Sequence, residues 1–351
     1  MLKALPSLLF DRNSPLSIRR AALPALAPWL IRFFRQSLPD KARKNAQALA
    51  ALLADAAPLW RELVADIGAG SLLSDRGCLY LYETESALAT ARGDLDVRRS
   101  LGVDVEILEP DAVSALEPGL AGAAGGAFFP GALFLTDPGA AVGHHLASAA
   151  QSAGAELMRQ RVDALRRTDG WVELRGPGYA ARARHVVLAA GAHSRALARM
   201  AGDSVPLDTE RGYHLEWDME TPPVSRPTSP APRGFYFCPM AGRLRVAGTV
   251  ELGGLKAPPS PHRLKLLEEG ANAFFPDLGA PSRSWMGFRP SMPDSLPVIG
   301  PSSKGPDVIH AFGHGHLGLT LAPATARMVA DFIAGRTQRI DPAPYLPARF
   351  A

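Results

Sequence analysis

The chain has 351 residues, a length that fits about two domains of ordinary size. Hydrophobic residues make up 47% and charged residues 21% of the sequence, which excludes a disordered chain and a coiled coil. The 33 glycines and 32 prolines predict many turns, and the formal net charge is +4.

The excess of positive over negative charge lies in the first 44 residues, where nine lysines and arginines accompany only Asp11 and Asp40. A solvated helical face is one interpretation of this segment. A peripheral membrane or partner surface is the other, because apolar and aromatic side chains lie among the cations. We do not expect nucleic acid as a partner, because no basic and aromatic stripe recurs elsewhere. The apolar and aromatic residues are Trp29, Leu30, Ile31, Phe33 and Phe34.

No segment of the sequence is expected to span a membrane. The longest nonpolar run, residues 21–31, is interrupted by two prolines and is far shorter than the roughly 20 residues that a bilayer requires. The first ten residues do not resemble a secretory signal. Cys78 and Cys238 form no metal-binding or redox spacing. We expect a cytoplasmic protein without a metal site, and association with the inner face of the membrane stays open as the alternative.

The first 130 residues are predicted to begin with helices and, after about residue 70, to contain both strands and helices. Ala/Leu-rich stretches predict helices up to about residue 70, interrupted by prolines. The pattern then changes to short strands that alternate with helices. The predicted elements are a helix at 45–67, a strand at 77–82, a helix at 87–102, a short capped segment at 109–120 and a strand at 126–134.

Residues 137–154 carry a complete set of helix signals. Asp137 suits the N-cap, Pro138 the first helical position and Gly154 the C-terminal stop. This segment is therefore predicted to form one amphipathic helix.

Strands dominate the next hundred residues. An Asp-Gly turn at 169–170 predicts a small meander, and the apolar run 185–191, which ends in Gly, is typical of a buried parallel strand. The expected strands are 156–162, 164–168, 171–174, 179–184 and 185–191, followed by 212–217, 234–237 and 243–249.

A Gly-rich turn near the C-terminus is the most informative segment. Residues 313–323 read Gly-His-Gly-His-Leu-Gly-Leu-Thr-Leu-Ala-Pro, between the apolar pair Val308-Ile309 and a predicted helix that ends near Gly335. Such a turn directs backbone N–H groups and a helix N-terminus toward an anionic group. The turn alone is a weak signal, but the block at 287–300, Gly-Phe-Arg-Pro-Ser-Met-Pro-Asp-Ser-Leu-Pro-Val-Ile-Gly, strengthens it.

These two blocks resemble the flavin-dependent D-amino acid oxidase superfamily, most closely its D-amino acid dehydrogenase-like branch, whose relatives include glycine oxidase and sarcosine oxidase. Residues 186–194, 211–214 and 242–251 resemble further motifs of this family. The resemblance implies an α/β (α+β) fold with an incomplete FAD-binding Rossmann-like domain, a three-stranded β meander and a mostly antiparallel substrate sheet with helices. The expected parts are a basic helical segment at 1–60, a substrate-binding domain at 61–130 and 205–286, and an FAD-binding remnant at 131–204 and 287–351.

The resemblance also implies which residues contact the cofactor. Val162 would meet the adenine end of FAD, and Ala190 and Gly191 would pass close to the dinucleotide. Ordinary packing at a strand end is the alternative for Ala190 and Gly191. The loop against the pyrimidine side of the flavin, where N–H groups stabilise negative charge, would be Gly313, His314, Gly315, His316, Leu317, Gly318, Leu319 and Thr320.

For the substrate, the resemblance makes Arg289 the carboxylate clamp, since a planar guanidinium binds a carboxylate in bidentate fashion. An ion pair at a domain interface is the alternative role for Arg289. Tyr213, His214, Tyr236 and His316 are candidates to line the pocket, although each is also compatible with a structural role.

The activity implied by the resemblance is oxidation of the CH–NH₂ or CH–NH group of a small amino acid. A hydride passes from Cα to flavin N5, and the imino acid then hydrolyses to a keto acid. FAD is expected to be noncovalent, because no cysteine lies near Arg289 in the sequence. Oxygen, a quinone and an electron-transfer protein all stay open as acceptors, and the basic N-terminal segment favours a quinone.

One family feature is missing from the sequence. The family begins with a strand, a G-x-G-x-x-G turn, a helix and an acidic residue, whereas residues 67–73 follow a helix and lack the third Gly. We therefore expect weak FAD binding. Three alternatives remain: an enzyme that lacks its first unit, a non-catalytic homologue or subunit that acts as a binding protein, and a partner chain that supplies the missing half.

Overall fold

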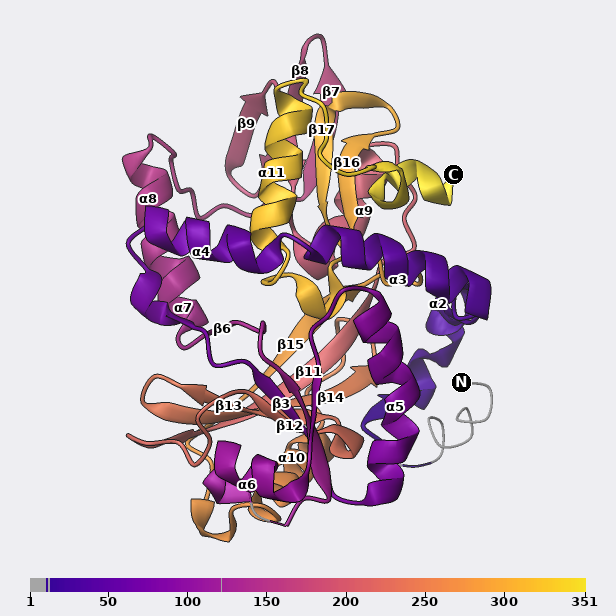
Figure 1. The fold of residues 1–351 in the computed structure, drawn as a ribbon. Coiled ribbons are helices and arrows are strands. Elements are labelled where there is room, and N and C mark those ends of the chain that lie inside the picture. The colour runs from indigo at the N-terminus through magenta and orange to yellow at the C-terminus, as the bar shows by residue number, and fades with distance from the viewer. Residues whose placement is uncertain (1–10, 12, 121) are drawn as a thin grey trace.

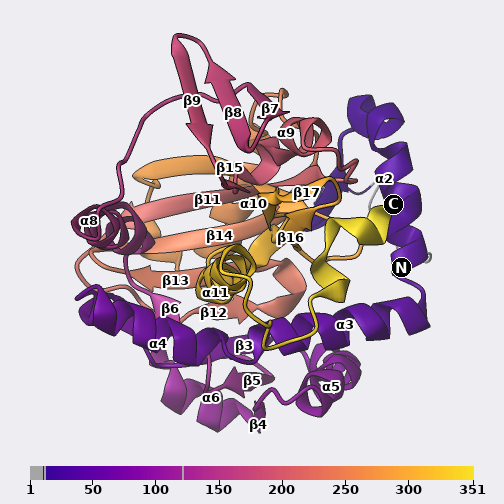
Figure 2. The ribbon, with the colours of Figure 1, turned by 90° about the horizontal axis from the view of Figure 1, so that it is seen from above.

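The computed structural model of the chain describes residue 11 and residues 13–120 and 122–351. A large sheet forms one half of the molecule, and a small sheet with a meander forms the other (Figure 1). The helices α3 and α4 cross between the two halves, and α11 covers the small sheet (Figures 1 and 2). No helix in the described part of the chain is long and apolar enough to cross a membrane.

The large sheet has nine strands in the order β15-β11-β14-β13-β12-β3-β5-β4, and β1 pairs in parallel with β14. Its long central strands β15, β11, β14 and β13 are antiparallel. The strands are β1 (Leu16–Ile18), β3 (Cys78–Tyr82), β4 (Glu106–Leu108), β5 (Gly125–Phe129), β11 (Asp208–Asp218), β12 (Thr228–Pro230), β13 (Phe235–Met240), β14 (Arg243–Leu252) and β15 (Arg283–Ser291).

The two faces of this sheet differ because side chains alternate along each strand. On one face Leu79, Leu215 and Val246 form the main hydrophobic core with Leu267 of α10 (Pro261–Asn272). The opposite face, here called the open face, carries the alternate residues of the same strands. It therefore presents the polar side chains of β11 and β14 toward the other half of the molecule.

The small sheet has the order β10-β17-β16, with β10 parallel to β17. One face packs with Leu52, Leu59 and Met328 of the helices α3, α4 and α11, and Val308 on the other face packs against the meander. The elements are β10 (Val186–Leu188), β16 (Val298–Ser302), β17 (Gly305–Phe312), α9 (Ser194–Met200) and α11 (Ala322–Ile333), with the meander β7 (Ala164–Thr168), β8 (Trp171–Gly176) and β9 (Tyr179–Ala183).

The outer edge of β10 has no strand partner among the described residues. Val187 in the middle of this strand is 41% exposed, although parallel strands are normally covered on both sides. The predicted parallel strand is thus confirmed, but its free edge leaves the small sheet open to a further strand.

The predicted strand at 156–162 is wrong. These residues are mostly exposed and form no strand, so the meander consists of β7, β8 and β9 alone. A strand exists only as a partner in a hydrogen-bonded ladder. Within the described chain nothing pairs with residues 156–162, so the segment stays irregular.

The predicted helix at 137–154 is confirmed. Asp137 Oδ1 accepts a hydrogen bond from the Ala140 N–H at 3.1 Å, and the helix runs through a π-helical turn at Ala141–Leu146. The other segments of this region are α5 (Glu85–Ser100), α6 (Pro110–Leu116), α7 (Pro138–Ala140), α8 (Ala147–Ser152), β2 (Leu73–Ser74) and β6 (Phe134–Leu135).

The N-terminal helices are α2 (Leu23–Gln36), α3 (Pro39–Leu53) and α4 (Ala56–Asp66). Trp29 of α2 is buried, and its indole N–H donates to the Ser291 carbonyl at 3.3 Å. Phe33 stacks on Trp29. Of the apolar side chains expected among the cations, Ile31 is the one that is largely exposed.

A buried ionic cluster joins the N-terminal segment to the large sheet. The fully buried Arg211 guanidinium donates to Glu251 Oε2 at 3.0 Å and to the carbonyls of Gly254, Ala257 and Pro258. Glu251 also pairs with Arg19 at 3.0 Å. Burial alone would raise the pKa of Glu251, but its hydrogen bonds outweigh that effect and lower it.

Replacing Arg211 tests how much this cluster stabilises the fold. We expect Arg211→Leu to reduce the free energy of unfolding by about 3–5 kcal/mol, because it leaves a buried carboxylate short of a partner. Arg175→Leu is the control: Arg175 pairs with Glu173 at the surface, and its loss should cost less than about 1 kcal/mol. Urea unfolding of both variants gives the comparison, and equal losses would contradict the assignment.

A second buried pair lies in β17. His310 is fully buried, and its Nε2 lies 2.8 Å from Asp203 Oδ2. Burial lowers the pKa of His310 despite the nearby carboxylate. Burial would raise the pKa of Asp203, but bonds from His310, Ser303 and Ser302 lower it overall. Both folded groups therefore resist protonation more strongly than the unfolded chain does.

We accordingly expect stability to decrease on acidification. Both folded pKa values lie below their unfolded values of about 6.5 for His and 3.9 for Asp, so the stabilisation is present above these values and is lost as the pH falls. Tm measured from pH 7.5 to pH 4 should fall, and the His310→Gln variant should show a smaller decrease over the range around pH 6. Identical pH profiles would refute this role of His310.

Candidate active site

Parallel pairing of β10 with β17 brings two Gly-containing loops to the same edge of the small sheet. Leu188 lies opposite His310, so the segments that follow, ending at Gly191 and Gly313, leave the sheet side by side. Gly191 and Gly313 have φ values of 54° and 82°, a region that favours glycine. The carboxyl edge of parallel strands is where open α/β sheets bind ligands.

Residues 313–320, here called the Gly-rich loop, present free backbone donors. In the described chain the N–H groups of Gly318, Leu319 and Thr320 donate to no backbone acceptor, and all three residues are exposed. The carbonyls of Leu319 and Thr320 instead accept from the Trp60 indole N–H at 3.0 and 3.2 Å. Trp60 thus binds the carbonyl groups of Leu319 and Thr320. The N–H groups of residues 318–320, which precede α11, stay available to an anionic group.

His314 and Gly313 fix the start of this loop. His314 Nε2 lies 2.9 Å from Thr325 Oγ1 on α11, and burial lowers the pKa of His314 to about 4, so the ring is neutral at pH 7. A Cβ on Gly313 would lie 2.9 Å from the Met292 side chain. The loop is therefore held closely against the end of β15.

Two predicted site residues meet through Glu210. His316 Nε2 lies 2.9 Å from Glu210 Oε2, and Arg289 stands opposite Glu210 in the β11–β15 register. Arg289 donates to the Thr249 carbonyl at 3.0 Å, in space that a side chain on Gly212 would fill. Burial lowers the pKa of Arg289, and Glu210 opposes this effect.

His214 lies on the same open face, four residues after Glu210 on β11. Its ring stacks on Trp285 with centroids 5.1 Å apart, and burial lowers the pKa of His214 to about 4. The neighbouring Glu216 pairs with Arg245 at 2.7 Å and with Arg283 at 3.1 Å. Burial would raise the pKa of Glu216, but these guanidinium bonds hold it at about 2.

Tyr236 is bound to a second tyrosine. The hydroxyl groups of Tyr236 and Tyr80 lie 2.6 Å apart, and the Arg98 guanidinium lies 5.4 Å from the Tyr80 ring centroid. Burial, followed by the neighbouring Tyr80, raises the pKa of Tyr236. The Tyr236 hydroxyl therefore resists deprotonation and stays within the hydrogen-bonded pair.

The structure does not bring Tyr213 to this face. Its side chain is buried in the main core, and its hydroxyl donates to Glu251 at 2.7 Å and accepts from the Ser260 N–H. Val162 is half-buried two residues before β7 begins, and the following Asp163 N–H donates to the Arg175 carbonyl near the end of β8. Ala190 is exposed at the end of β10, beside Gly191.

A cavity of about 580 Å³ lies between the Gly-rich loop and the open face. Leu319 and Thr320 line one side, and Cys238, Met240 and Arg245 line the other. Its remaining walls are mostly apolar and come from α4 and residues 131–135. We call it the apolar cavity, and Arg245 is the one charged residue in its wall.

The sequence analysis missed Glu210, Arg245 and Trp60 as site residues. Arg245 lies within the block 242–251, whose alternation places Arg243 and Arg245 on the same side of a strand. The alternation could have predicted that Arg243 and Arg245 share a face of the strand. It could not have shown whether that face lines a site or the core. Trp60 carries no local signal, because its role depends on the distant loop that it contacts.

Comparison with known proteins agrees with this arrangement. Residues 20–332 match the model of the DAO family, described as FAD dependent oxidoreductase. The chain is 34% identical over 363 aligned positions to a D-amino-acid oxidase of Bradyrhizobium diazoefficiens (99% of this chain, 84% of the relative). It is 31% identical over 373 positions to D-amino acid dehydrogenase 2 of Ralstonia nicotianae (99% of this chain, 86% of the relative).

Among solved structures, glycine oxidase from Geobacillus kaustophilus superposes with a TM-score of 0.74 at 27% identity and covers 92% of this chain and 83% of its own. The family match spans most of the chain, and the sequence relatives cover nearly all of it. The chain therefore belongs to the DAO family of FAD-dependent oxidoreductases.

Proposed function

We propose that the protein oxidises the α-amino group of a D-amino acid with an apolar side chain. The observation that carries this proposal is the apolar cavity between Leu319 and Thr320 of the Gly-rich loop, whose N–H groups have no backbone acceptor among the described residues, and Arg245 of the open face. The relatives named D-amino-acid oxidase and D-amino acid dehydrogenase support the substrate class.

The residues at the carboxyl edge of the small sheet fit FAD, the cofactor of the family. Three consecutive backbone donors at 318–320 suit the anionic pyrimidine side of a flavin. A Cβ on Gly191 would meet no neighbouring atom, so this position leaves room for a close ligand. FAD, when bound, supplies the acceptor for the hydride from the substrate Cα.

The protein's own contribution is to bind and orient the substrate. We propose Arg289 as the clamp for the substrate carboxylate, with Glu210 and His316 fixing its position beside the loop. The apolar walls take the side chain and exclude water. With a pKa of about 4, His214 is neutral at pH 7, so it adds no positive charge that would repel the amine.

We further propose that tight FAD binding requires one more strand unit on the free edge of β10. The exposed Val187 supports this proposal, and so does the greater length of the relatives, of which the chain covers 84% in the Bradyrhizobium oxidase. Such a unit could come from the same polypeptide or from a partner chain. A chain that acquires it from neither source would be a non-catalytic binding subunit.

A membrane quinone is the electron acceptor that we favour. Arg32, Arg35 and Lys41 are exposed around α2 and α3, and Ile31 and Leu38 are exposed beside them. A surface of this composition suits the face of an anionic membrane. Turnover with a water-soluble quinone, compared with oxygen consumption, tests this choice.

The carboxylate role of Arg289 is tested in the FAD-loaded enzyme. We expect Arg289→Leu to raise KM for D-amino acids about 10- to 100-fold, because a charge-assisted pair contributes about 1.5–3 kcal/mol. Steady-state kinetics with a dye acceptor measures this change across a panel of D-amino acids. Arg339→Leu, which removes an exposed charge, is the control, and an unchanged KM in Arg289→Leu would remove this residue from the proposed role.

FAD binding by the chain of residues 1–351 is expected to be weak. Titration of flavin fluorescence should show substoichiometric or millimolar binding, because one edge of the cofactor's sheet is unpaired. Fusion to the strand-turn-helix-strand unit of a relative should restore a yellow protein. A stoichiometric flavin absorbance in the unfused chain would contradict the requirement for that unit.

A further inference from the structure

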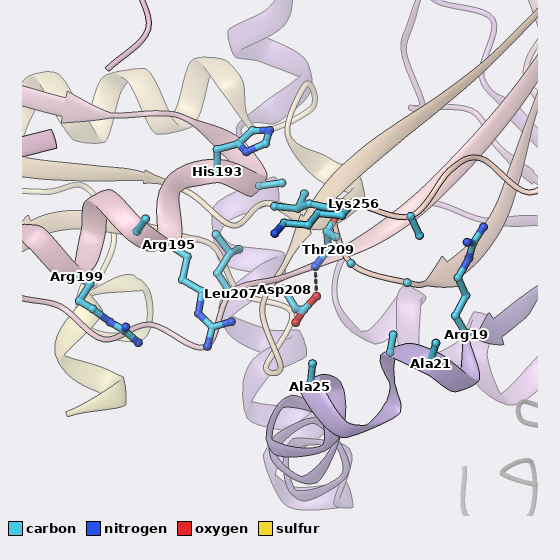
Figure 3. A pocket seen from close by; sticks show the side chains of 17 residues that line it. Arg19, Ala21, Ala25, His193, Arg195, Arg199, Leu207, Asp208, Thr209 and Lys256 are labelled. Carbon is cyan, nitrogen blue, oxygen red and sulfur yellow. Dashed lines mark hydrogen bonds between the residues drawn. The ribbon is translucent and has the colours of Figure 1, made fainter. Parts of the chain in front are cut away.

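A second, larger cavity has none of the Gly-rich loop in its lining, although Ala192 and His193, which directly follow Gly191, do line it. It has a volume of about 1000 Å³ and is enclosed by α9, the N-terminal part of α2, the start of β11 and the loop 253–257 (Figure 3). None of residues 313–320 lines it, and neither Arg289 nor Gly191 does. We call it the basic cavity.

Three exposed basic side chains line this cavity without a hydrogen-bonded partner among the described residues. Arg195 and Arg199 lie one turn apart on α9, and Lys256 extends from the opposite loop (Figure 3). Within the described part of the chain none of the three is recorded in a hydrogen bond or a close ion pair, although Arg195 lies near enough to Asp208 to lower its pKa. The positive charge in the lining therefore exceeds the negative charge, which Asp208 alone supplies.

Asp208 is the one carboxylate in the lining. Its Oδ1 accepts from the Thr209 N–H at 2.7 Å, and burial raises the pKa of Asp208 although Arg195 opposes this effect. Arg19 also reaches the lining, but it is already paired with Glu251. The balance of charge in the cavity thus favours an anionic ligand carrying more than one charge.

The loop that carries Lys256 is held rigidly. The buried Arg211 binds the carbonyls of Gly254, Ala257 and Pro258, on both sides of Lys256. Arg19 donates to the Pro258 carbonyl as well, at 2.7 Å. The backbone that carries the lysine is therefore positioned before any ligand arrives, which reduces the entropy that the loop loses on binding.

We propose that the basic cavity is a binding site for a small phosphate-bearing molecule, separate from the active site. The two guanidinium groups can each donate two parallel hydrogen bonds to phosphoryl oxygens, and the ammonium group adds a positive point charge. Ala21, Ala25 and Leu255 form an apolar wall beside them, which suits the uncharged part of such a ligand. Inorganic diphosphate and a nucleoside diphosphate share this chemistry.

Isothermal titration calorimetry of the full chain with inorganic diphosphate and with ADP tests the proposal. We expect one site per chain. The double variant Arg195→Gln/Lys256→Gln should weaken binding about 100-fold, about tenfold for each lost charge-assisted contact. The control Arg35→Gln/Arg339→Gln removes the same net charge from exposed positions outside the cavity, and it should change the affinity less than about twofold at 0.15 M salt.

Tm of each variant verifies that it is folded, and Arg199→Gln alone provides a second, milder variant. Binding of ADP but not of diphosphate identifies a nucleotide, and binding of both identifies the phosphoryl group as sufficient. Equal weakening in the cavity and control variants, or no binding of either probe at millimolar concentration, would overturn the proposal. A third result would also overturn the proposal: FAD displaces the diphosphate, and the same variants lose affinity for FAD. The cavity would then belong to the cofactor site.

Discussion

The parallel pairing of β10 with β17 is the interaction on which the candidate site depends. It aligns two chain segments that are more than a hundred residues apart, so that Gly191 and Gly313 leave the sheet at one edge. The same pairing leaves the other edge of β10 without a partner in the described chain. A single ladder therefore sets both the edge at which we propose that the dinucleotide lies and the free edge on which we propose a further strand.

Strand β11 connects that edge to the substrate side of the molecule. Its alternate residues Arg211 and Tyr213 point into the core and bind Glu251, while Glu210 and His214 lie on the open face. The residues on the core face hold β11 in place through Glu251. The residues on the open face, Glu210 and His214, contact His316 and Trp285. This division leaves the guanidinium of Arg289 close to the loop without a carboxylate bonded to it.

Much of this arrangement could be predicted from the sequence. The apolar run before Gly191 correctly predicted a parallel strand, and Asp137 correctly marked the start of a helix, whereas the pairing of that strand with residues 308–310 comes from the structure. The strand predicted at 156–162 failed because alternation shows a preference and cannot supply a partner. The side on which Tyr213 lies was also beyond reach, since alternation does not identify the buried face. Trp60 and Glu210 became visible only when distant segments met.

The irregular segment between α8 and β7 has its own consequence. Residues 155–160 are exposed, including Leu157 and Met158, and no strand holds them. Exposed, unpaired backbone is the preferred target of proteases, and Arg159 and Arg161 provide two cleavage sites for trypsin within it. Partial digestion should therefore cut the chain between α8 and β7. Resistance to trypsin at Arg159 and Arg161 would indicate that another segment covers this stretch.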